Sequence, residues 1–215
     1  MIRIKICCIS SITEARTAIS YGPSAIGLVA RMPSGQGVIT DELIYEIAKT
    51  IPPPVATFLL TSETTSGGIV SHHRRVNTNT IQIVDELKKG TYRDIKEKLR
   101  GIKIVQVIHV LNERSIDEAL KVSEKVDALL LDSGNPNLTV KELGGTGRTH
   151  NWAISRKIVE QSKVPVFLAG GLNAENVREA IEIVQPFGVD VCSGVRTDEK
   201  LDLNKLEAFF RAVLG

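Results

Sequence analysis

The alternation of short apolar runs with helical patterns constrains the fold of this chain more than any other feature. Eight apolar runs of the kind found in buried parallel strands occur in the 215 residues, and a segment with helical spacing of apolar residues follows each of them. Strands that alternate with helices predict a parallel sheet. Eight pairs of about 27 residues each predict a single (β/α)8 TIM barrel of minimal length over residues 1–215. An open doubly wound sheet is the alternative, but such a sheet does not require eight pairs.

The expected strands and helices follow one another without a linker-like segment. Ser11 and Thr40 are suited to cap the first two helices, and Asn173 is expected to cap the seventh. The eight strands are expected at residues 2–7, 25–30, 54–60, 80–84, 102–110, 128–131, 164–169 and 189–192.

Composition excludes several functional classes. Charged residues make up 24% of the chain and the net charge is only +2, so neither a nucleic acid nor a membrane surface is an expected partner. No apolar run approaches the roughly 20 residues of a membrane span, and no signal peptide is recognisable. Cys7, Cys8 and Cys192 form neither a disulfide framework nor a metal-binding spacing. We therefore expect a cytoplasmic protein with reduced cysteines.

In a TIM barrel the functional residues lie at the C-terminal ends of the strands. Asp132 ends the sixth strand, and the glycine cluster 144–147 follows it before the next helix. Gly170-Gly171 follow the seventh strand and Ser193-Gly194 the eighth. Glycine allows backbone N–H groups to approach a phosphate closely, so these loops predict a phosphate site. The alternative for the segment after Asp132 is an ordinary strand–loop–helix link with glycines used only for turns.

Several segments together resemble one enzyme family. They are Lys5-Ile6-Cys7, LLLDS with GGTGRTHNW, LAGGLNAENV and GVDVCSGVR. The chain is similar in these segments to phosphoribosylanthranilate isomerase, a barrel enzyme of tryptophan biosynthesis. The resemblance implies an Amadori rearrangement of an N-aryl ribosylamine 5-phosphate without metal or redox cofactor. It assigns Cys7 as general base and Asp132 as general acid, and it places in phosphate-binding loops Gly145, Thr146, Gly147, Gly170, Gly171, Ser193 and Gly194.

The implied chemistry suits these residue types. An acid must protonate the furanose ring oxygen, and partial desolvation would adjust Asp132 to that task. A base must then remove the proton on C2 of the sugar, and a thiolate of Cys7 beside Lys5 is suited to this step. Taken alone, Cys7 fits a buried packing cysteine better than a catalytic one.

The sequence departs from the family pattern near the aromatic end of the substrate. Gln36 or Gly37 stands near the arginine that holds the anthranilate carboxylate in the family, so recognition by charge is lost unless Arg31 reaches the site. Cys8 replaces the glycine after the catalytic cysteine, and Arg196 replaces an acidic residue. Further candidates for substrate contacts are Lys5, Arg31, Gln36, Asp85 and His109.

Three functions stay open on the sequence alone. They are phosphoribosylanthranilate isomerase activity, isomerisation of another phosphorylated sugar amine, and binding of a phosphorylated ligand by a non-catalytic barrel. In each case the expected partner is a small phosphorylated sugar, and the protein is a monomer or a homodimer. The adjacent residues His72 and His73 do not share a helix face, so we expect them on a solvated surface rather than at a metal. His109 either helps to position substrate or is a satisfied core histidine.

Overall fold

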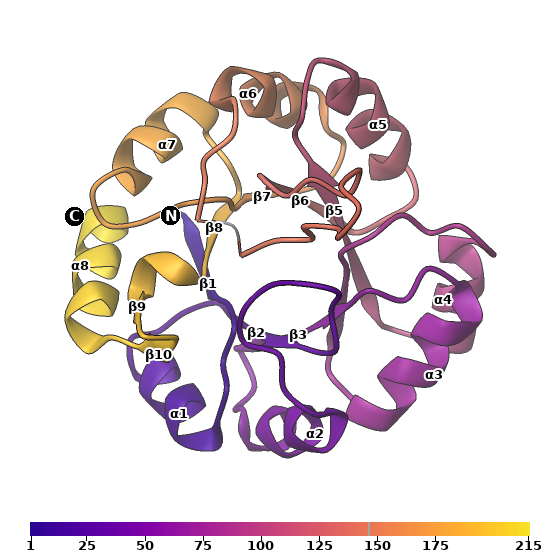
Figure 1. Ribbon diagram of the computed structural model, residues 1–215, viewed down its shortest axis with the longest axis horizontal. Coiled ribbons are helices and arrows are strands. Elements are labelled where there is room, and N and C mark those ends of the chain that lie inside the picture. The colour runs from indigo at the N-terminus through magenta and orange to yellow at the C-terminus, as the bar shows by residue number, and fades with distance from the viewer. Residues whose placement is uncertain (146) are drawn as a thin grey trace.

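The computed structural model describes residues 1–145 and 147–215 and contains a closed barrel of eight parallel strands in chain order (Figure 1). Pairing of the last strand with the first closes the barrel, with Lys5 in register with Asp190. The prediction of a single (β/α)8 TIM barrel is confirmed. The strands are β1 Arg3–Ile6, β2 Ala25–Val29, β3 Ala56–Thr61, β4 Thr80–Ile83, β5 Lys103–His109, β6 Ala128–Asp132, β7 Val166–Leu168 and β8 Gly188–Val191.

Eight α-helices surround the strands as a ring (Figure 1). Ser11 and Thr40 cap the first two of them, as predicted, by accepting hydrogen bonds from the backbone N–H groups of Glu14 and Leu43. The helices are α1 Ile12–Ser20, α2 Asp41–Thr50, α3 Ser66–Val76, α4 Tyr92–Lys98, α5 Arg114–Ser123, α6 Trp152–Gln161, α7 Val177–Val184 and α8 Leu203–Leu214.

Alternate residues of each strand face two separate apolar layers. On β1, Ile4 and Ile6 face the helices, whereas Cys7 belongs to the smaller cluster inside the barrel. Phe58 and Phe167 fill the interior and meet edge to face, with ring centroids 6.1 Å apart. The barrel interior is therefore a packed core, and the cavity lined by Cys7, Asp132 and Ser193 lies at the C-terminal ends of the strands.

The predicted cap of α7 is wrong, and the short elements after β8 were not predicted. The cap of α7 is Asn176, because the Asn173 side chain accepts N–H bonds in the turn before the helix. After β8 the chain forms a short 3-10 helix, Ser193–Val195, and an antiparallel pair, β9 Arg196–Thr197 with β10 Lys200–Leu201. These elements are too short for hydrophobic periodicity to reveal them.

His72 and His73 are buried rather than solvated. His72 bridges β3 and α2 through hydrogen bonds to Thr61 Oγ1 and Asp41 Oδ1, and His73 bonds to the Thr78 carbonyl. The expectation of a surface position is wrong because α3 packs against the barrel and against its neighbouring helices, so more than one face of this helix is buried. The described residues contain no cluster of His, Cys, Asp and Glu arranged to hold a metal ion.

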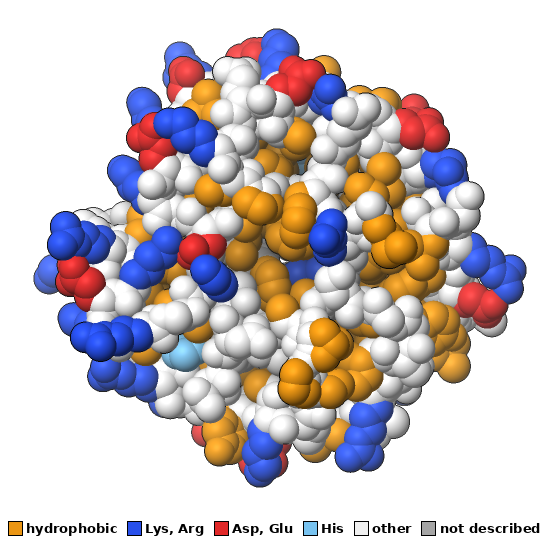
Figure 2. All heavy atoms as spheres, turned by 180° about the vertical axis from the view of Figure 1, so that it is seen from behind, with side chains coloured by type: hydrophobic (Ala, Val, Ile, Leu, Met, Phe, Trp, Pro, Cys, Tyr) orange, Lys and Arg blue, Asp and Glu red, His pale blue; other side chains and the backbone are white. Residues whose placement is uncertain are grey.

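From behind, the rim of the molecule carries acidic and basic side chains intermingled, with apolar side chains nearer the middle (Figure 2). This mixture of signs on the visible face agrees with the small net charge of +2. Among the described helices, none has the length and apolar character needed to cross a membrane.

Candidate active site

A small cavity at the ends of the strands brings Cys7 and Asp132 to one site. Cys7 directly follows β1 and Asp132 ends β6, and both line the cavity together with Gln82, Asp190 and Ser193. Cys7 is 4% exposed and Asp132 7% exposed, so both groups are largely withdrawn from bulk water. An acid and a thiol from well-separated parts of the barrel therefore line a common space.

Cys7 lies beside a buried ion pair inside the barrel. Lys5 Nζ donates to Asp190 Oδ1 at 2.8 Å, and the Lys5 side chain is fully buried. Burial raises the pKa of the Cys7 thiol to about 11, while the charge of Lys5 and a hydrogen bond from it act in the opposite direction. The thiol is therefore protonated at neutral pH in the ligand-free protein.

The pair of Lys5 and Asp190 is itself strongly perturbed. Burial acts to lower the pKa of Lys5, but Asp190 and Cys7 outweigh it and raise that pKa. Burial raises the pKa of Asp190, and Lys5 only partly opposes this shift. Lys5 also lies over the Phe58 ring, with Nζ 5.3 Å from the centroid. Lys5 thus places positive charge next to the thiol from below the cavity rather than lining the cavity.

Gly27 of β2 makes room for these groups. A Cβ atom at Gly27 would lie 2.7 Å from Cys7 Sγ and 3.0 Å from Lys5 Nζ. Both neighbours are buried and Lys5 is held by Asp190, so neither can move aside freely. We expect Gly27→Ala to lower the free energy of unfolding by about 1–3 kcal/mol and to lower kcat by displacing the thiol.

The matched control for Gly27→Ala is Gly67→Ala. Gly67 lies in the first turn of α3, and a Cβ there meets no atom within 4 Å. We expect the free energy of unfolding of this variant to stay the same or to rise by up to about 1 kcal/mol. Denaturant unfolding with parallel steady-state kinetics checks both variants, and equal behaviour of the two would contradict the assigned role of Gly27.

Asp132 is the last residue of β6, and the loop between β6 and α6 lies against its side chain. Its Oδ1 accepts a hydrogen bond from the Ser133 N–H at 2.8 Å. A Cβ on Gly144 would lie 2.9 Å from Asp132 Oδ2, and Gly144 has φ +140°. Glycine therefore allows the loop between β6 and α6 to cover the carboxyl group closely.

His150 lies near the same carboxyl group. Its Nε2 bonds to Ser155 Oγ at 2.7 Å, and a Cβ on Gly170 would lie 3.1 Å from its Nδ1. Burial lowers the pKa of His150 to about 4, and the charge of Asp132 opposes this shift. His150 is therefore neutral in the folded protein at pH 5–7.

The depressed pKa of His150 makes stability fall as the pH falls. The unfolded chain binds a proton at His150 below pH 6.5, while the folded protein stays neutral there until about pH 4. Between pH 7 and pH 5 this single group is expected to lower the free energy of unfolding by about 2 kcal/mol. We expect His150→Gln to lose that part of the pH dependence, as measured by urea unfolding at both pH values. An equal pH dependence in both proteins would contradict this assignment.

Glycines from two loops lie around the proposed phosphate seat. Gly145, Gly170, Gly171 and Ser193 line the cavity. Gly170 and Gly171 have φ of +81° and +63°, and a Cβ at Gly171 would lie 2.6 Å from the Arg148 carbonyl carbon. Gly147 lies near Ser193 Oγ at the edge of this group, while Gly194 packs against the Leu172 carbonyl outside the cavity. Thr146 lies outside the described residues.

The structure places the remaining predicted contacts in different places. Gln36 lines the cavity. Arg31 lines a separate groove with Asp41, and Asp85 and His109 line a third pocket between β4 and β5. Asp85 pairs with Lys141 at 2.5 Å, and His109 Nε2 bonds to the Val84 carbonyl. Arg31, Asp85 and His109 thus do not share the cavity of Cys7 and Asp132.

The prediction that the cysteines are reduced is wrong. Cys8 and Cys192 form a disulfide, with Cα atoms 5.8 Å apart, and Cys7 is the free cysteine. The pairing joins residues 184 positions apart and becomes visible only once β8 lies next to β1. Linear spacing therefore gave no sign of it.

Two loops cover the cavity. The Ser34 hydroxyl donates to the Lys141 carbonyl at 2.6 Å, which joins the loop after β2 to the loop after β6. The enclosed volume is about 70 Å³, whereas sites for drug-sized ligands measure about 300–1,000 Å³. The cavity is therefore narrow compared with a typical small-molecule site.

Asp190 and Gln82 are lining residues that the sequence reasoning missed. Asp190 is a lone carboxylate among the apolar residues of β8, and this contrast is the signal that marks it. Gln82 is buried in β4, and its Oε1 has no hydrogen-bond partner among the described residues. Its alternation with Val84 along the strand places both on the interior face.

Comparisons with known proteins agree with this geometry. Residues 4–212 match the family model "N-(5'phosphoribosyl)anthranilate (PRA) isomerase". N-(5'-phosphoribosyl)anthranilate isomerase of Methanocella arvoryzae is 33% identical over 99% of this chain and 98% of its own length. The enzyme of the same name from Methanosarcina acetivorans is 34% identical over 98% of this chain and 92% of its own length.

Solved structures extend the similarity to three dimensions. The phosphoribosyl anthranilate isomerase of Thermotoga maritima has a TM-score of 0.80 and 29% identity, and the match covers 99% of this chain and 98% of that one. A second structure of such an isomerase contains reduced 1-(o-carboxyphenylamino)-1-deoxyribulose 5-phosphate. It has a TM-score of 0.77 and 27% identity, with 99% and 98% of the two chains covered.

Proposed function

Because the chain belongs to the N-(5'-phosphoribosyl)anthranilate isomerase family, we propose that Cys7 and Asp132 carry out the Amadori rearrangement of N-(5'-phosphoribosyl)anthranilate. The chain is an isomerase of the kind that interconverts an aldose and a ketose, in tryptophan biosynthesis. One observation above all supports the residue roles: Cys7 and Asp132 line one cavity that also contains Gly170, Gly171 and Ser193.

Asp132 acts first, as the general acid. It protonates the furanose ring oxygen, the bond from C1 to that oxygen breaks, and the nitrogen lone pair forms a cationic imine. The cover of the Gly144 segment removes water from the carboxyl group and keeps the proton directed at the substrate. The product of this step places a positive charge near C2 of the sugar.

Cys7 acts second, as the general base. Burial holds the pKa of its thiol at about 11 in the ligand-free protein, and the cationic imine then joins Lys5 in favouring the thiolate, with the thiol proton passing to the Asp132 carboxylate that the first step leaves ionised. The thiolate removes the C2 proton, the electrons move toward nitrogen, and the resulting enol gives the ketose after proton transfer. Cys7 thus ionises only after the imine has formed, which is the point in the reaction when a base is required.

The glycine loops and Ser193 hold the phosphate of the substrate. Their backbone N–H groups and the hydroxyl can donate hydrogen bonds to the phosphate oxygens. The phosphate then fixes the sugar between Asp132 and Cys7, which is a positioning effect separate from the proton transfers.

The aromatic end of the cavity favours a second candidate substrate class. No Lys or Arg lines the cavity among the described residues, and Gln36 supplies hydrogen bonds but no charge. The family arginine that would pair with a carboxylate has no counterpart there. Another phosphorylated sugar amine, lacking that carboxylate, is therefore the alternative substrate.

Turnover assays test both candidates. We expect the purified protein to convert N-(5'-phosphoribosyl)anthranilate and its gene to restore growth to a tryptophan auxotroph that lacks this isomerase. A kcat/KM more than about 100-fold higher than for the aniline analogue, which lacks the carboxylate, supports the first substrate. A ratio of the two kcat/KM values under about tenfold supports a phosphorylated sugar amine without the carboxylate. Tight binding of phosphorylated sugars without any turnover contradicts both substrates.

A further inference from the structure

The residue directly after Cys7 has an unusual backbone conformation. Cys8 has φ +63°, in the left-handed region that non-glycine residues rarely adopt. Such a conformation persists only when the surrounding structure enforces it. The contacts around Cys8 therefore indicate what fixes the direction of the neighbouring Cys7 side chain.

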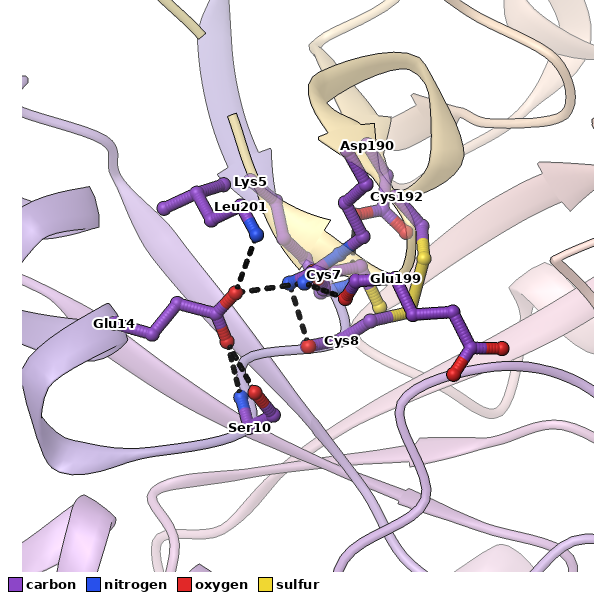
Figure 3. The surroundings of a disulfide bond; sticks show 10 residues. Lys5, Cys7, Cys8, Ser10, Glu14, Asp190, Cys192, Glu199 and Leu201 are labelled. Carbon is purple, nitrogen blue, oxygen red and sulfur yellow. Dashed lines mark hydrogen bonds and ion pairs between the residues drawn. A yellow bond between two sulfur atoms is a disulfide. The ribbon is translucent and has the colours of Figure 1, made fainter. Parts of the chain in front are cut away.

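The first constraint is covalent. The Cys8–Cys192 disulfide ties the turn after β1 to the residue that follows β8 (Figure 3). The adjacent backbone is in register, since the Cys7 N–H donates to the Val191 carbonyl at 2.8 Å. One side of the turn is thus fastened to the neighbouring strand.

The second constraint is a buried guanidinium. Arg196 Nη2 donates to the carbonyls of Cys7 and Cys8, at 3.2 and 2.6 Å. Its Nη1 donates to Glu14 Oε1 at 2.7 Å and to the Glu199 carbonyl at 2.8 Å. The side chains of Arg196 and Glu14 are only 3% and 9% exposed, so water does not screen their interaction.

Glu14 in turn is held in place by its own partners. Its Oε1 also accepts the Leu201 N–H at 3.0 Å, and its Oε2 accepts the Ser10 N–H at 2.5 Å and the Ser10 hydroxyl at 2.8 Å (Figure 3). The hydrogen bonds and the charge of Arg196 keep the pKa of Glu14 low against the effect of burial. The carboxylate is thus a fixed anchor for Arg196.

We propose that Arg196, anchored by Glu14, and the Cys8–Cys192 disulfide are positioning elements that hold the Cys7–Cys8 turn so that the Cys7 thiol faces the substrate. This inference rests on the proposed role of Cys7 as the base. The two constraints act on the same turn from the β8 side, and either one alone retains part of the geometry. Arg196 does not line the cavity, and Cys8 and Cys192 line it only as a disulfide without a titratable group, so both elements affect the proton transfer through Cys7.

The proposal predicts a specific kinetic pattern. A displaced thiol slows proton removal, so kcat falls, while the phosphate seat keeps KM nearly unchanged. Arg196→Gln and Cys192→Ser are each expected to lower kcat about threefold. The double variant is expected to lose at least about 30-fold, more than the product of the single effects, because neither of the two proposed elements then holds the turn.

Reduction of the disulfide gives the same test without a substitution. A dithiol reductant converts the Cys8–Cys192 bond to two thiols and is itself oxidised to a cyclic disulfide. We expect reduction to lower kcat of the wild type about threefold and of Arg196→Gln about tenfold or more, reversibly on reoxidation. Cys192→Ser, which has no disulfide, is expected not to respond. If the double variant fails to fold, reduced Arg196→Gln takes its place.

Controls separate this proposal from the proposed function. Arg211→Gln removes an exposed arginine from the surface pair with Glu207 and is expected to leave kcat unchanged. A folded double variant with kcat within twofold of wild type, or with KM raised in proportion to the loss, would overturn the positioning role. If that occurs while Cys7→Ala is inactive, the base assignment stands; an active Cys7→Ala would instead overturn the assignment itself.

Discussion

Cys7→Ala is expected to lower kcat by about 10²- to 10⁴-fold, with little change in KM. General acid–base catalysis by a positioned side chain contributes about this factor. KM is preserved because Gly170, Gly171 and Ser193, which we propose as the phosphate seat, are untouched. Asp132→Asn is expected to lower kcat to a similar extent, because an amide does not deliver a proton to the ring oxygen. Steady-state kinetics on N-(5'-phosphoribosyl)anthranilate measure both effects.

Met32→Leu is the matched control for these two variants. Met32 lines the same cavity but has no titratable group, and the exchange conserves its volume. Its kcat is expected to stay within about threefold of wild type. Retention of wild-type kcat by either Cys7→Ala or Asp132→Asn would assign that proton transfer to another group. The next candidate for a base in the cavity would then be Asp190.

The raised pKa of Cys7 also predicts how the reactivity of its thiol depends on pH. Because that pKa is about 11, the thiolate fraction in the ligand-free protein rises about tenfold per pH unit between pH 7 and 10. Alkylation of Cys7 by iodoacetamide, followed by mass spectrometry, is expected to accelerate in proportion. A rate that is already constant at pH 8 would show that the thiol is ionised before substrate binds.

The sequence was sufficient for the barrel, and it indicated the two residues that we propose as proton-transfer groups. Eight apolar runs with intervening helical patterns determine the count, and Asp132 stands at a strand end where the barrel places function. Cys7 was recognisable because the Lys5-Ile6-Cys7 segment resembles a known family. These features depend on short stretches of chain, and this is why sequence patterns report them.

The features that the sequence did not reveal depend on contacts across the closed barrel. The disulfide and the Lys5–Asp190 pair both join β1 to β8, whose residues are more than 180 positions apart. Arg196 was recognisable only as a departure from the family pattern, because its partners are backbone carbonyls of the opposite end of the chain. Closure of the barrel creates these contacts, and no local periodicity encodes them.

Lys5→Met is expected to lower the free energy of unfolding by about 3–5 kcal/mol. The substitution leaves Asp190 as a buried carboxylate without its partner, and loss of one member of a buried pair has this order of cost. Lys163→Met is the matched control, since Lys163 is 73% exposed and pairs with Glu124 at the surface. We expect that control to lose at most about 1 kcal/mol. Urea unfolding of both variants measures the difference.

The double variant Lys5→Met with Asp190→Leu separates stability from catalysis. Both charges are then absent from the interior, and a well-packed apolar pair restores most of the lost stability. The Cys7 thiolate nevertheless lacks the charge and hydrogen bond of Lys5, which lower its pKa, and the removal of Asp190, whose charge raises that pKa, compensates only in part, so kcat is expected to stay low. Recovery of kcat together with stability would mean that Lys5 supports only the fold. Recovery of stability alone would show that the pair is retained in the barrel because it favours an ionised base.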